Sequence, residues 1–417
     1  MLDIKFIREN PEIVKKAAQN KGIDIDIEHI LEIDNKLRGL DLMVQKLRED
    51  RNKFAKAASN AVGKEEAINK GKEIKVRLEK QENALKAVSE ELREWLLKIP
   101  NPAKKDVKIG KDDSDNEVIR KWGEIRKFDF KLLDHLDLGE KLDIIDVKRA
   151  SKVSGARFGY LKGDAVLLEF ALIQLGLEML IKEGFIPVVP PVLVTKEVMK
   201  GLGYMENGGE EDMYHLEKDD MYLVGTAEHA LVPMHKDEVL SAKDLPIRYV
   251  GFSSAFRREA GSYGKDTKGI LRVHQFDKLE MVSFVKDGED DKEHEYLLSL
   301  EEKLFKALEI PYQVVKMCSG DLGFPAARKY DLEAWMPGQG KYREVTSVST
   351  VTDFQSRRLN IKYQDGNDKK YVNILNGTGF AFGRTIIAIL ENYQKEDGSI
   401  EIPKVLQKYI GKSTIKE

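Results

Sequence analysis

Hydrophobic positions in the first hundred residues recur at alternating steps of four and three. One run covers residues 33–61 and a second covers 71–99, with a break at Gly63 between them and Pro100 at the end. This spacing is the a/d seam of a coiled coil. Two runs of similar length around one short break predict an antiparallel helical hairpin over about 27–99. At about 1.5 Å per residue, its helices would be on the order of 50 Å long.

The chain beyond residue 117 mixes helical periodicity with period-two alternation, which predicts an α+β domain. The central prediction is a β-hairpin, Ile247–Glu259 and Leu271–Val285, around a polar loop that contains Gly261, Gly264 and Gly269. Two further segments carry a specific signal: the prolines of FIPVVPPVLV predict an edge strand, and YLVGTAEHAL predicts a strand that turns into a helix with Thr226 as N-cap. The other expected helices cover Asp164–Glu183 and Glu293–Leu308. The other expected strands cover Tyr312–Met317, Tyr330–Met336 and Arg343–Ser349, and YVNILNGTGFAFGRTIIAILEN predicts a strand followed by a helix.

Length and composition fit a soluble protein of two to three domains. The chain has 417 residues, of which 34% are charged and 41% hydrophobic, and its formal net charge is -3. Abundant Lys and Glu beside one Cys is a composition typical of thermophiles. The charged, apolar-poor segment Asn101–Glu117 is interpreted as a linker, which places a domain boundary near residue 110.

Cysteine and hydropathy patterns narrow the classes of protein. Cys318 is the single cysteine, so one chain has no disulfide framework and no multi-cysteine zinc site. No run approaches eighteen apolar residues, and the first residues, MLDIKFIREN, carry acids where a signal peptide has its apolar core. We therefore expect a cytoplasmic protein without a membrane partner.

The predicted hairpin carries the densest candidate chemistry. Period-two alternation would put Arg257 and Glu259 on one face of the first strand, and Phe276 and Glu280 on one face of the second. A guanidinium group binds phosphate or carboxylate through two hydrogen bonds, and an aromatic ring stacks on a base. The alternative is a salt-bridged, solvated hairpin, which these residues alone do not exclude.

Three other places offer weaker signals. Glu228 begins a helix, where an acid commonly compensates the helix dipole. Glu344 and Ser347 present oxygens that suit Mg²⁺. Arg384 opens a helix after Gly377, Gly379 and Gly383, which favours anion binding, although tight packing of a glycine-rich loop is an alternative. The spacing fits neither a Walker A loop nor GxGxxG.

The region near the break in the helical hairpin is basic. A structural or dimerising coiled coil is the alternative use of such a hairpin, but a basic tip on a rigid projection suits a phosphate backbone. The cations are Arg51, Lys53, Lys56, Lys64, Lys70, Lys72, Lys75 and Arg77, against Glu65, Glu66 and Glu73.

Together these segments resemble the class II aminoacyl-tRNA synthetases, and among them the seryl-tRNA synthetases. The resemblance rests on the proline-bearing helix and strand (motif 1, about 164–194), FRREAGSYGKDTKGILRVHQFDKLE in the hairpin (motif 2, about 247–285), and NGTGFAFGRTIIAILENYQ (motif 3, about 371–394). TAE at 226–228, EVTSVSTVTDFQSRR at 344–358 and the helical hairpin match as well, so the resemblance covers essentially the whole chain.

The resemblance implies a serine-tRNA ligase. Its fold would be an antiparallel sheet flanked by helices, residues 111–417, after a tRNA-binding domain, residues 1–110, and the protein would be a homodimer. The reaction would form seryl-adenylate and pyrophosphate from L-serine and ATP. The seryl group would then pass to the 3′ end of tRNA(Ser), and of tRNA(Sec) where it exists.

The resemblance also implies roles for individual residues. Arg257, Arg384 and Glu344 would be catalytic, and Glu344 and Ser347 would hold Mg²⁺, with no zinc. The serine site would contain Thr226, Ala227, Glu228, Arg257, Glu280, Asn376 and Thr378. The ATP site would contain Arg257, Arg258, Glu259, Arg272, Phe276, Glu344, Val345, Thr346, Ser347 and Arg384. The basic residues of the arm would contact tRNA.

The serine hydroxyl has the clearest physical logic, because a site built to bond a hydroxyl leaves polar groups unpaired when alanine enters, at a cost of about 10⁴-fold in rate. Four positions differ from the residues that are frequent in the family: Arg258, Val348, Thr350 and Val351. We expect these differences to affect the rate and the geometry of cation binding, and not the type of reaction. Two alternatives stay open: a paralogue that activates an amino acid for a carrier protein, and a non-enzymatic RNA-binding or scaffold protein.

Overall fold

The computed structural model describes residues 1–58, 64–260, 266 and 268–417, and the chain forms two compact units, Met1–Pro100 and Asn101–Glu417. Ala61, Gly63, Gly261 and Gly264, which entered the predictions of the hairpin breaks, lie outside these residues. Within the described ranges, no helix combines the length and apolar character that crossing a membrane requires.

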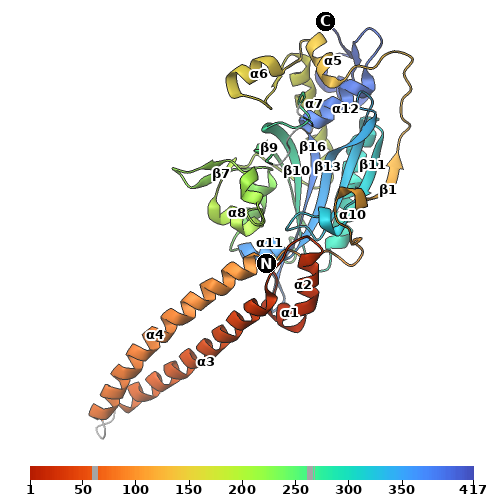
Figure 1. Cartoon of the computed structure of the whole chain (residues 1–417). Helices are drawn as coiled ribbons and strands as arrows, with labels where there is room; N and C mark the ends of the chain where they lie inside the picture. Colours follow the sequence, from red (N-terminus) through yellow and green to blue (C-terminus); the bar gives the residue numbers. More distant parts are fainter. Residues whose placement is uncertain (59–63, 261–265, 267) are drawn as a thin grey trace. The chain divides into compact units, whose positions relative to one another are not determined.

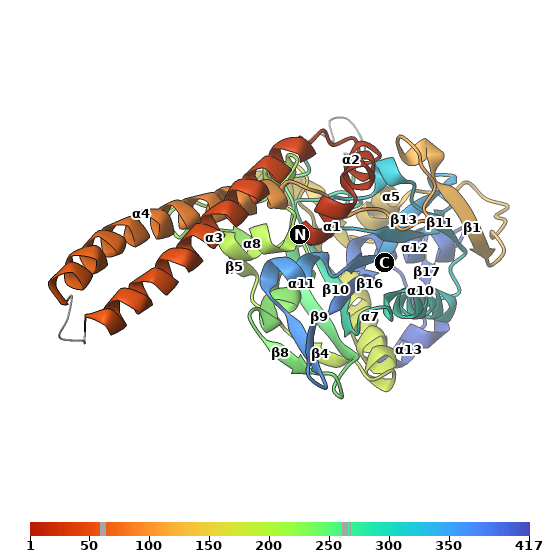
Figure 2. The ribbon, with the colours of Figure 1, turned by 90° about the horizontal axis from the view of Figure 1, so that it is seen from below.

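The first unit is the predicted helical hairpin with two short helices before it. Helices α3 and α4 lie side by side, as both views show (Figures 1 and 2). Val44, Leu47 and Leu78 are buried between them, and Arg48 pairs with Glu82 across the seam at 2.7 Å. The Asp26 carboxylate caps α3 by accepting the His29 N–H at 2.9 Å. The helices are α1 (Ile4–Glu9), α2 (Pro11–Gln19), α3 (Ile27–Ala57) and α4 (Lys64–Leu97).

The second unit is built on an eight-stranded sheet in the order β1-β11-β12-β13-β16-β10-β9-β4. Every pairing is antiparallel except that of the edge strand β4 with β9. This confirms the predicted antiparallel sheet and the proline-bearing edge strand. The strands are β1 (Glu117–Trp122), β11 (Tyr312–Lys316), β12 (Arg328–Met336), β13 (Lys341–Thr352), β16 (Asn373–Ala381), β10 (Gln275–Val285), β9 (Ile247–Phe256) and β4 (Ile186–Val188).

Helices cover one face of this sheet and a smaller mixed layer covers the other. The main core lies between the sheet and α7 (Asp164–Lys182), α10 (Asp290–Ala307) and α12 (Phe382–Tyr393). A second core lies under α8 and α9. The remaining elements are α5 (His135–Lys141), α6 (Val147–Ser154), α8 (Lys196–Leu202), α9 (Glu228–Leu231), α11 (Phe354–Leu359), α13 (Lys404–Ile410), β2 (Ile145–Asp146), β3 (Tyr160–Leu161), β5 (Leu193–Thr195), β6 (His215–Leu216), β7 (Met221–Leu223), β8 (Val239–Ser241), β14 (Lys362–Asp365), β15 (Asp368–Tyr371), β17 (Ile400–Glu401) and β18 (Thr414–Ile415), with 3-10 turns at Asp113–Asp115, Gly209–Asp212, Val232–His235 and Ser319–Asp321.

The central hairpin is confirmed, but its strands are shorter than predicted. Strand β9 ends at Phe256 and β10 begins at Gln275, so Arg257 and Glu259 lie beyond the sheet. Glu259 has φ +53°, which is not an extended conformation. The prediction that alternation places Arg257 and Glu259 on one strand face is therefore wrong. Tertiary hydrogen bonds place them instead.

The linker prediction is wrong for the first residues of Asn101–Glu117. The buried Asn101 side chain donates to the carbonyls of Pro325 and Val351 at 2.9 and 2.8 Å. Val107 is buried against Val315 and Leu322. One amide and one apolar side chain anchor this segment to the second unit, a role that its charged composition does not reveal. The domain boundary near residue 110 stays a prediction.

Candidate active site

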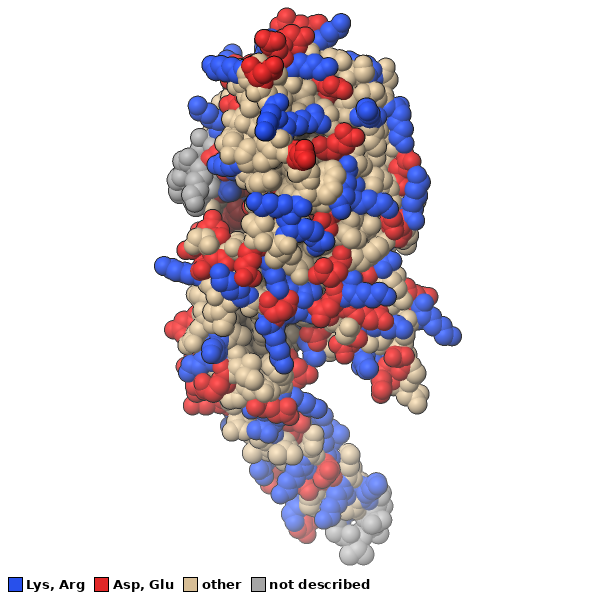
Figure 3. Space-filling model, turned by 90° about the vertical axis from the view of Figure 1, so that its right-hand side faces the viewer, with Lys and Arg blue, Asp and Glu red and all other residues tan. Residues whose placement is uncertain are grey.

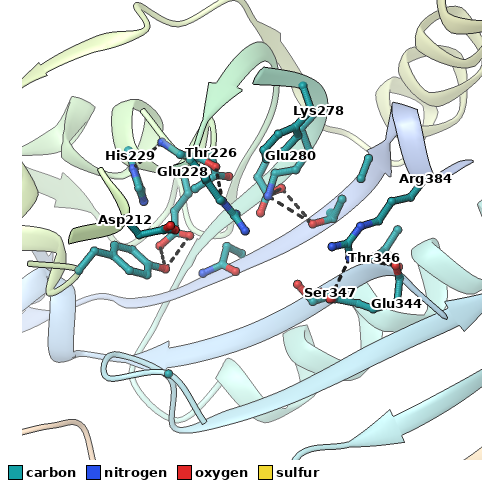
Figure 4. Close-up of a pocket in the computed structure, with 18 of the residues that line it drawn as sticks. Asp212, Thr226, Glu228, His229, Lys278, Glu280, Glu344, Thr346, Ser347 and Arg384 are labelled. Carbon is teal, nitrogen blue, oxygen red and sulfur yellow. Dashed lines mark hydrogen bonds and ion pairs between the residues drawn. The ribbon is translucent and has the colours of Figure 1, made fainter. Parts of the chain in front are cut away.

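A cavity of about 410 Å³ lies over the middle strands of the sheet, under the layer that carries α9. Figure 4 shows Glu228 and its neighbours at one end, Arg384 and Glu344 at the other, and Lys278 and Glu280 between them. Most predicted site residues line it: Thr226, Glu228, Arg257, Glu259, Arg272, Phe276, Glu280, Glu344, Val345, Thr346, Ser347, Asn376, Thr378 and Arg384. Residues more than 150 positions apart in the sequence thus meet in one cavity.

Two predicted site residues are not part of the cavity lining. Ala227 is buried in the core under α9. Arg258 is exposed, its backbone N–H donates to the Asp212 carbonyl at 2.8 Å, and its guanidinium group lies 5.7 Å from the Tyr214 ring centre. Of the residues that depart from the family pattern, Val351 lines the cavity, while Val348 is buried in the main core and Thr350 donates to Asp290 on α10 at 2.9 Å.

A polar corner forms where β10 and β16 pair. Glu280 lies opposite Thr378, whose hydroxyl donates to the Glu280 carboxylate at 3.2 Å. Lys278 lies 2.6 Å from the same carboxylate oxygen. All three side chains are buried, and the Asn376 amide nitrogen beside them has no hydrogen-bond partner among the described residues. A buried donor without a partner is costly, so this corner is built to receive a polar ligand.

Glu228 forms a second polar corner. Tyr204 donates to both of its carboxylate oxygens at 2.9 Å, and Gln355 donates to one of them at 2.9 Å. Burial raises the pKa of Glu228 to about 7, the charge of Glu280 adds to the rise, and the two hydrogen bonds oppose it. A cationic ligand group would therefore find an acid that ionises near neutral pH.

The predicted N-cap role of Thr226 is wrong. Helix α9 begins at Glu228 with Ala227 as its N-cap, and the Thr226 carbonyl accepts the His229 N–H at 3.1 Å. The Thr226 hydroxyl is buried without a hydrogen-bond partner in the part of the chain that is described, and Thr226 lines the cavity. The hydroxyl is thus available to a ligand and is not needed by the helix.

Arg257 is held by the backbone of a distant segment. Its Nε donates to the Gly225 carbonyl at 3.2 Å, and its own N–H donates to the His274 carbonyl at 3.0 Å. His229 holds Gly225 from the other side, because its Nδ1 accepts the Gly225 N–H at 3.1 Å. Burial lowers the pKa of His229 to about 3, with Arg257 and Lys278 adding to the effect, so the imidazole is neutral and accepts this bond.

Two ion pairs and one aromatic ring line the end of the cavity that lies away from Glu228. The Arg257 guanidinium group lies 5.4 Å from the Phe276 ring centre. Arg272 donates to Glu259 at 2.8 Å, and Arg384 donates to the carboxylate and the carbonyl of Glu344, both at 2.9 Å. A guanidinium group can bind phosphate and an aromatic ring can stack on a base, so these side chains suit a nucleotide.

Glu344 and Ser347 fit a hard cation. Burial acts to raise the pKa of Glu344, but Arg384 and Lys329 outweigh it and lower the pKa to about 2, so the carboxylate is ionised. Ser347 lines the same wall. No group of three or more His, Cys, Asp or Glu residues within the described ranges could hold a metal alone. One carboxylate and one hydroxyl match the way Mg²⁺ is bound together with substrate phosphates.

Several residues that line or support the cavity were not predicted from the sequence. Lys278 is two positions from Glu280 on β10, so alternation along that strand could have found it. Lys329 on β12 also lines the cavity and pairs with Asp331 at 3.0 Å. Tyr204 and Gln355 support Glu228 from other segments and carry no signal in their local sequence.

The predicted tRNA contacts all lie on the first unit. Each of the eight basic residues from Arg51 to Arg77 is exposed, and Lys70 pairs with Glu66 at 2.6 Å. Figure 3 shows lysine and arginine side chains interspersed with acidic ones along this hairpin. All eight side chains lie at the surface, where a partner can contact them.

Comparisons with known proteins agree with this geometry. The family model described as the seryl-tRNA synthetase N-terminal domain matches residues 1–103, and that of the tRNA synthetase class II core domain (G, H, P, S and T) matches residues 213–393. The chain is 48% identical to a serine–tRNA ligase of Dictyoglomus thermophilum and 45% identical to one of Pyrococcus horikoshii, covering 99–100% of this chain and 99% and 96% of those relatives.

Solved structures agree as well. The seryl-tRNA synthetase of Pyrococcus horikoshii complexed with ATP matches with a TM-score of 0.92 at 43% identity, covering 100% of this chain and 99% of that one. The cytoplasmic serine–tRNA ligase of Naegleria fowleri in complex with AMP matches with a TM-score of 0.89 at 33% identity over the same shares. With both domains, the cavity and full-length relatives in agreement, this chain belongs to the seryl-tRNA synthetase family of class II aminoacyl-tRNA synthetases.

Proposed function

We propose that the cavity binds L-serine and ATP side by side and carries out the ligation of serine to tRNA that defines the family. A serine carboxylate oxygen attacks the α-phosphorus of ATP, the bond to the β-phosphate breaks, and seryl-adenylate and pyrophosphate form. A ribose hydroxyl at the 3′ end of tRNA(Ser), or of tRNA(Sec), then attacks the seryl carbonyl and releases AMP. The observation that carries this proposal is the meeting of Arg257, Arg384, Glu280 and Thr378 in one cavity.

The contacts suggest a division of roles. Arg257 would hold the α-phosphate and the serine carboxylate, because Gly225 fixes its guanidinium group over Phe276. Phe276 and Arg384 would enclose the adenine, and Glu259 would contact its edge while Arg272 binds phosphate. Catalysis would come from positioning and charge neutralisation, since little covalent chemistry falls to the protein.

The serine end of the cavity would read both polar groups of the amino acid. Thr226 and Glu228 would bind the ammonium group, and Glu280, Thr378 and Asn376 would surround the hydroxyl. Glu344 and Ser347 would hold Mg²⁺, which neutralises phosphate charge when it is bound. We place this activity in the cytoplasm.

The deciding experiment is ATP–pyrophosphate exchange with each of the twenty amino acids. Serine alone should support strong exchange, and tRNA(Ser) should then be charged. Exchange without charging of any tRNA would instead favour the carrier-protein paralogue. Absence of serine-dependent exchange contradicts the proposal and leaves the RNA-binding alternative.

The pH dependence of serine binding should report Glu228. Because burial raises its pKa to about 7, the carboxyl is protonated below that pH and offers no charge to the ammonium group. The KM for serine should therefore rise about tenfold per pH unit as the pH falls below about 7, with ATP saturating. Glu228→Gln is the control and should show a high KM that varies little with pH. A KM that stays constant from about pH 5.5 to 7 would refute the assignment.

We propose that the helical hairpin binds the tRNA backbone. The triple variant Lys70→Glu, Lys72→Glu and Lys75→Glu should bind tRNA(Ser) about 10- to 100-fold more weakly at low salt. Its affinity should also depend less on salt concentration, because each lost cation removes a phosphate contact. Pyrophosphate exchange should not change. The same reversal at Lys80, Lys86 and Arg93, on the same helix but further from its start, is the matched control and should cost less affinity. An equal loss in both variants would mean that the contact is not local to the predicted residues.

We also propose that the second unit forms a homodimer through α7 and β4. Leu167, Phe170 and Ile181 on α7 are 44%, 58% and 48% exposed, and Ile186 and Val189 at the sheet edge are 53% and 82% exposed. Apolar side chains grouped at a sheet edge that can pair suit a second copy of the chain. Phe170→Glu should raise the dimer dissociation constant at least about 100-fold in sedimentation experiments, because it buries an unpaired charge. Val153→Glu, at an exposed apolar residue on α6, is the control and should leave the dimer intact.

A further inference from the structure

The polar corner around Glu280 contains a buried cation that the proposed function does not use. Lys278 is 7% exposed and lines the cavity. Its ammonium group lies 2.6 Å from Glu280 Oε2 and 3.5 Å from Thr378 Oγ1. An ammonium group has three N–H donors, and these two contacts use two of them. A third donor can therefore serve an oxygen atom of a ligand.

Several buried acidic side chains lie around Glu280, and a cation beside them would offset their charge. Glu228 and Glu301 are buried near Glu280, and the charge of Glu280 contributes to raising the pKa of both, after burial as the main cause. Lys278 acts in the opposite direction on Glu228. Arg257, the other nearby cation, is held at the Gly225 carbonyl and over Phe276. Lys278 is thus the cation that contacts Glu280 directly.

The strand geometry aims Lys278 into this corner. Glu280 pairs with Thr378, while Lys278 pairs with Ala381, and the register shifts between Leu279 and Glu280. The extra residue of this bulge, Gly379, lies on β16, so the bulge turns Thr378 toward the corner, while Lys278 and Glu280 share one face of β10 by alternation. Figure 4 shows Lys278 and Glu280 in the same part of the cavity, between the two ends.

A hydroxyl group needs one acceptor for its proton and one donor for its oxygen lone pairs. Glu280 supplies the acceptor, and Thr378 already donates to that carboxylate at 3.2 Å. The Lys278 ammonium group supplies the donor that the hydroxyl oxygen needs. We propose that Lys278 is a specificity residue of the serine site, which pairs with Glu280 in the empty corner and donates to the substrate hydroxyl when serine binds.

This role changes the basis on which alanine is rejected. The pairing of Lys278 with Glu280 satisfies both charges when no hydroxyl is present, so alanine leaves neither unpaired. Selectivity then comes from the contacts that serine adds. Loss of the Lys278 donor should therefore lower the preference for serine over alanine.

The test rests on the proposed function and measures what the hydroxyl contributes to binding. The probes are two sulfamoyl adenylate analogues, one seryl and one alanyl, which differ by the hydroxyl and do not react. For the unchanged chain, the alanyl analogue should have the larger dissociation constant. In Lys278→Met this ratio of dissociation constants should fall about 10- to 100-fold, because a hydrogen bond to a charged donor is lost.

The control is Lys329→Met, which removes a second, partly exposed lysine that lines the cavity and pairs with a carboxylate. Its ratio should stay within about twofold of that of the unchanged chain, since a general effect on folding weakens both analogues alike. An unchanged ratio in Lys278→Met overturns the inference. If neither analogue binds the unchanged chain, the proposed function itself fails.

A second measurement needs no variant. A crystal structure of the full chain with the seryl analogue should place the hydroxyl oxygen within about 3.2 Å of Lys278 Nζ. A hydroxyl that contacts Glu280 and Thr378 alone, with Lys278 turned away, contradicts the inference even if Lys278→Met fails to fold.

Discussion

Glu280→Ala is expected to lower serine-dependent pyrophosphate exchange by about 10- to 100-fold, because a hydrogen bond to a charged group is worth about 1.5–3 kcal/mol and the serine hydroxyl has one proton to donate to Glu280. The loss should be in serine affinity. The affinity for ATP alone should change by no more than about twofold, since the Arg384 and Phe276 side of the cavity is untouched. Exchange kinetics over a range of serine concentrations and ATP binding by calorimetry measure the two effects.

Removal of Glu280 also leaves Lys278 buried without the partner that lies 2.6 Å away. Loss of one member of a buried pair costs about 3–5 kcal/mol, so Glu280→Ala should have a lower melting temperature. The double variant Glu280→Ala with Lys278→Met removes this cost and should recover stability but not serine activation. Equal losses of serine and ATP binding in the double variant would refute the assignment of Glu280 to the hydroxyl.

Arg384→Ala is expected to reduce pyrophosphate exchange by about 10²- to 10³-fold, the usual cost of removing one preorganised charge from a developing transition state. Arg384 donates twice to Glu344 at 2.9 Å in the structure. Burial opposes its charge, but Glu344 outweighs burial and raises the pKa of Arg384, so the group is a permanent cation. Single-turnover formation of seryl-adenylate measures the effect.

Glu344→Gln separates the proposed metal site from this arginine. It removes the carboxylate charge and keeps the size of the side chain, so half-maximal exchange should require more Mg²⁺, by about tenfold. Arg384→Ala should not shift the Mg²⁺ requirement in this way. If both variants depend on Mg²⁺ as the unchanged chain does, Glu344 does not hold the metal.

The local sequence was sufficient for the two long helices of the first unit and for most strands of the eight-stranded sheet. The 4-3 spacing predicted α3 and α4 because a helical seam is a property of one segment and its immediate neighbours. Alternation predicted β10 to β13, and the prolines predicted the edge position of β4. Errors occurred at ends of elements, where other segments compete for the backbone. Arg258, for instance, leaves the hairpin because its N–H donates to the Asp212 carbonyl at 2.8 Å.

The candidate site divides in the same way. Motifs pointed to Glu280, Glu344 and Arg384 because each lies in a dense, recognisable stretch. Tyr204 and Gln355 were missed because their importance comes from hydrogen bonds to Glu228, to which the fold brings them from 24 and 127 residues away. Lys278 was overlooked although it lies beside Glu280, since a lysine in a strand is ordinarily solvated.

The order of elements, the basic hairpin and the residue types available for chemistry were determined by the sequence by itself, because periodicity, turn chemistry and charge are local properties. Only the tertiary structure decided which of those residues share a cavity, which are buried, and which charges pair with one another. Burial and pairing depend on segments that meet through the sheet order β12-β13-β16-β10-β9. Burial raises the pKa of Glu228, whereas the charges of Arg384 and Lys329 outweigh burial and lower the pKa of Glu344, although the two residues are of the same type.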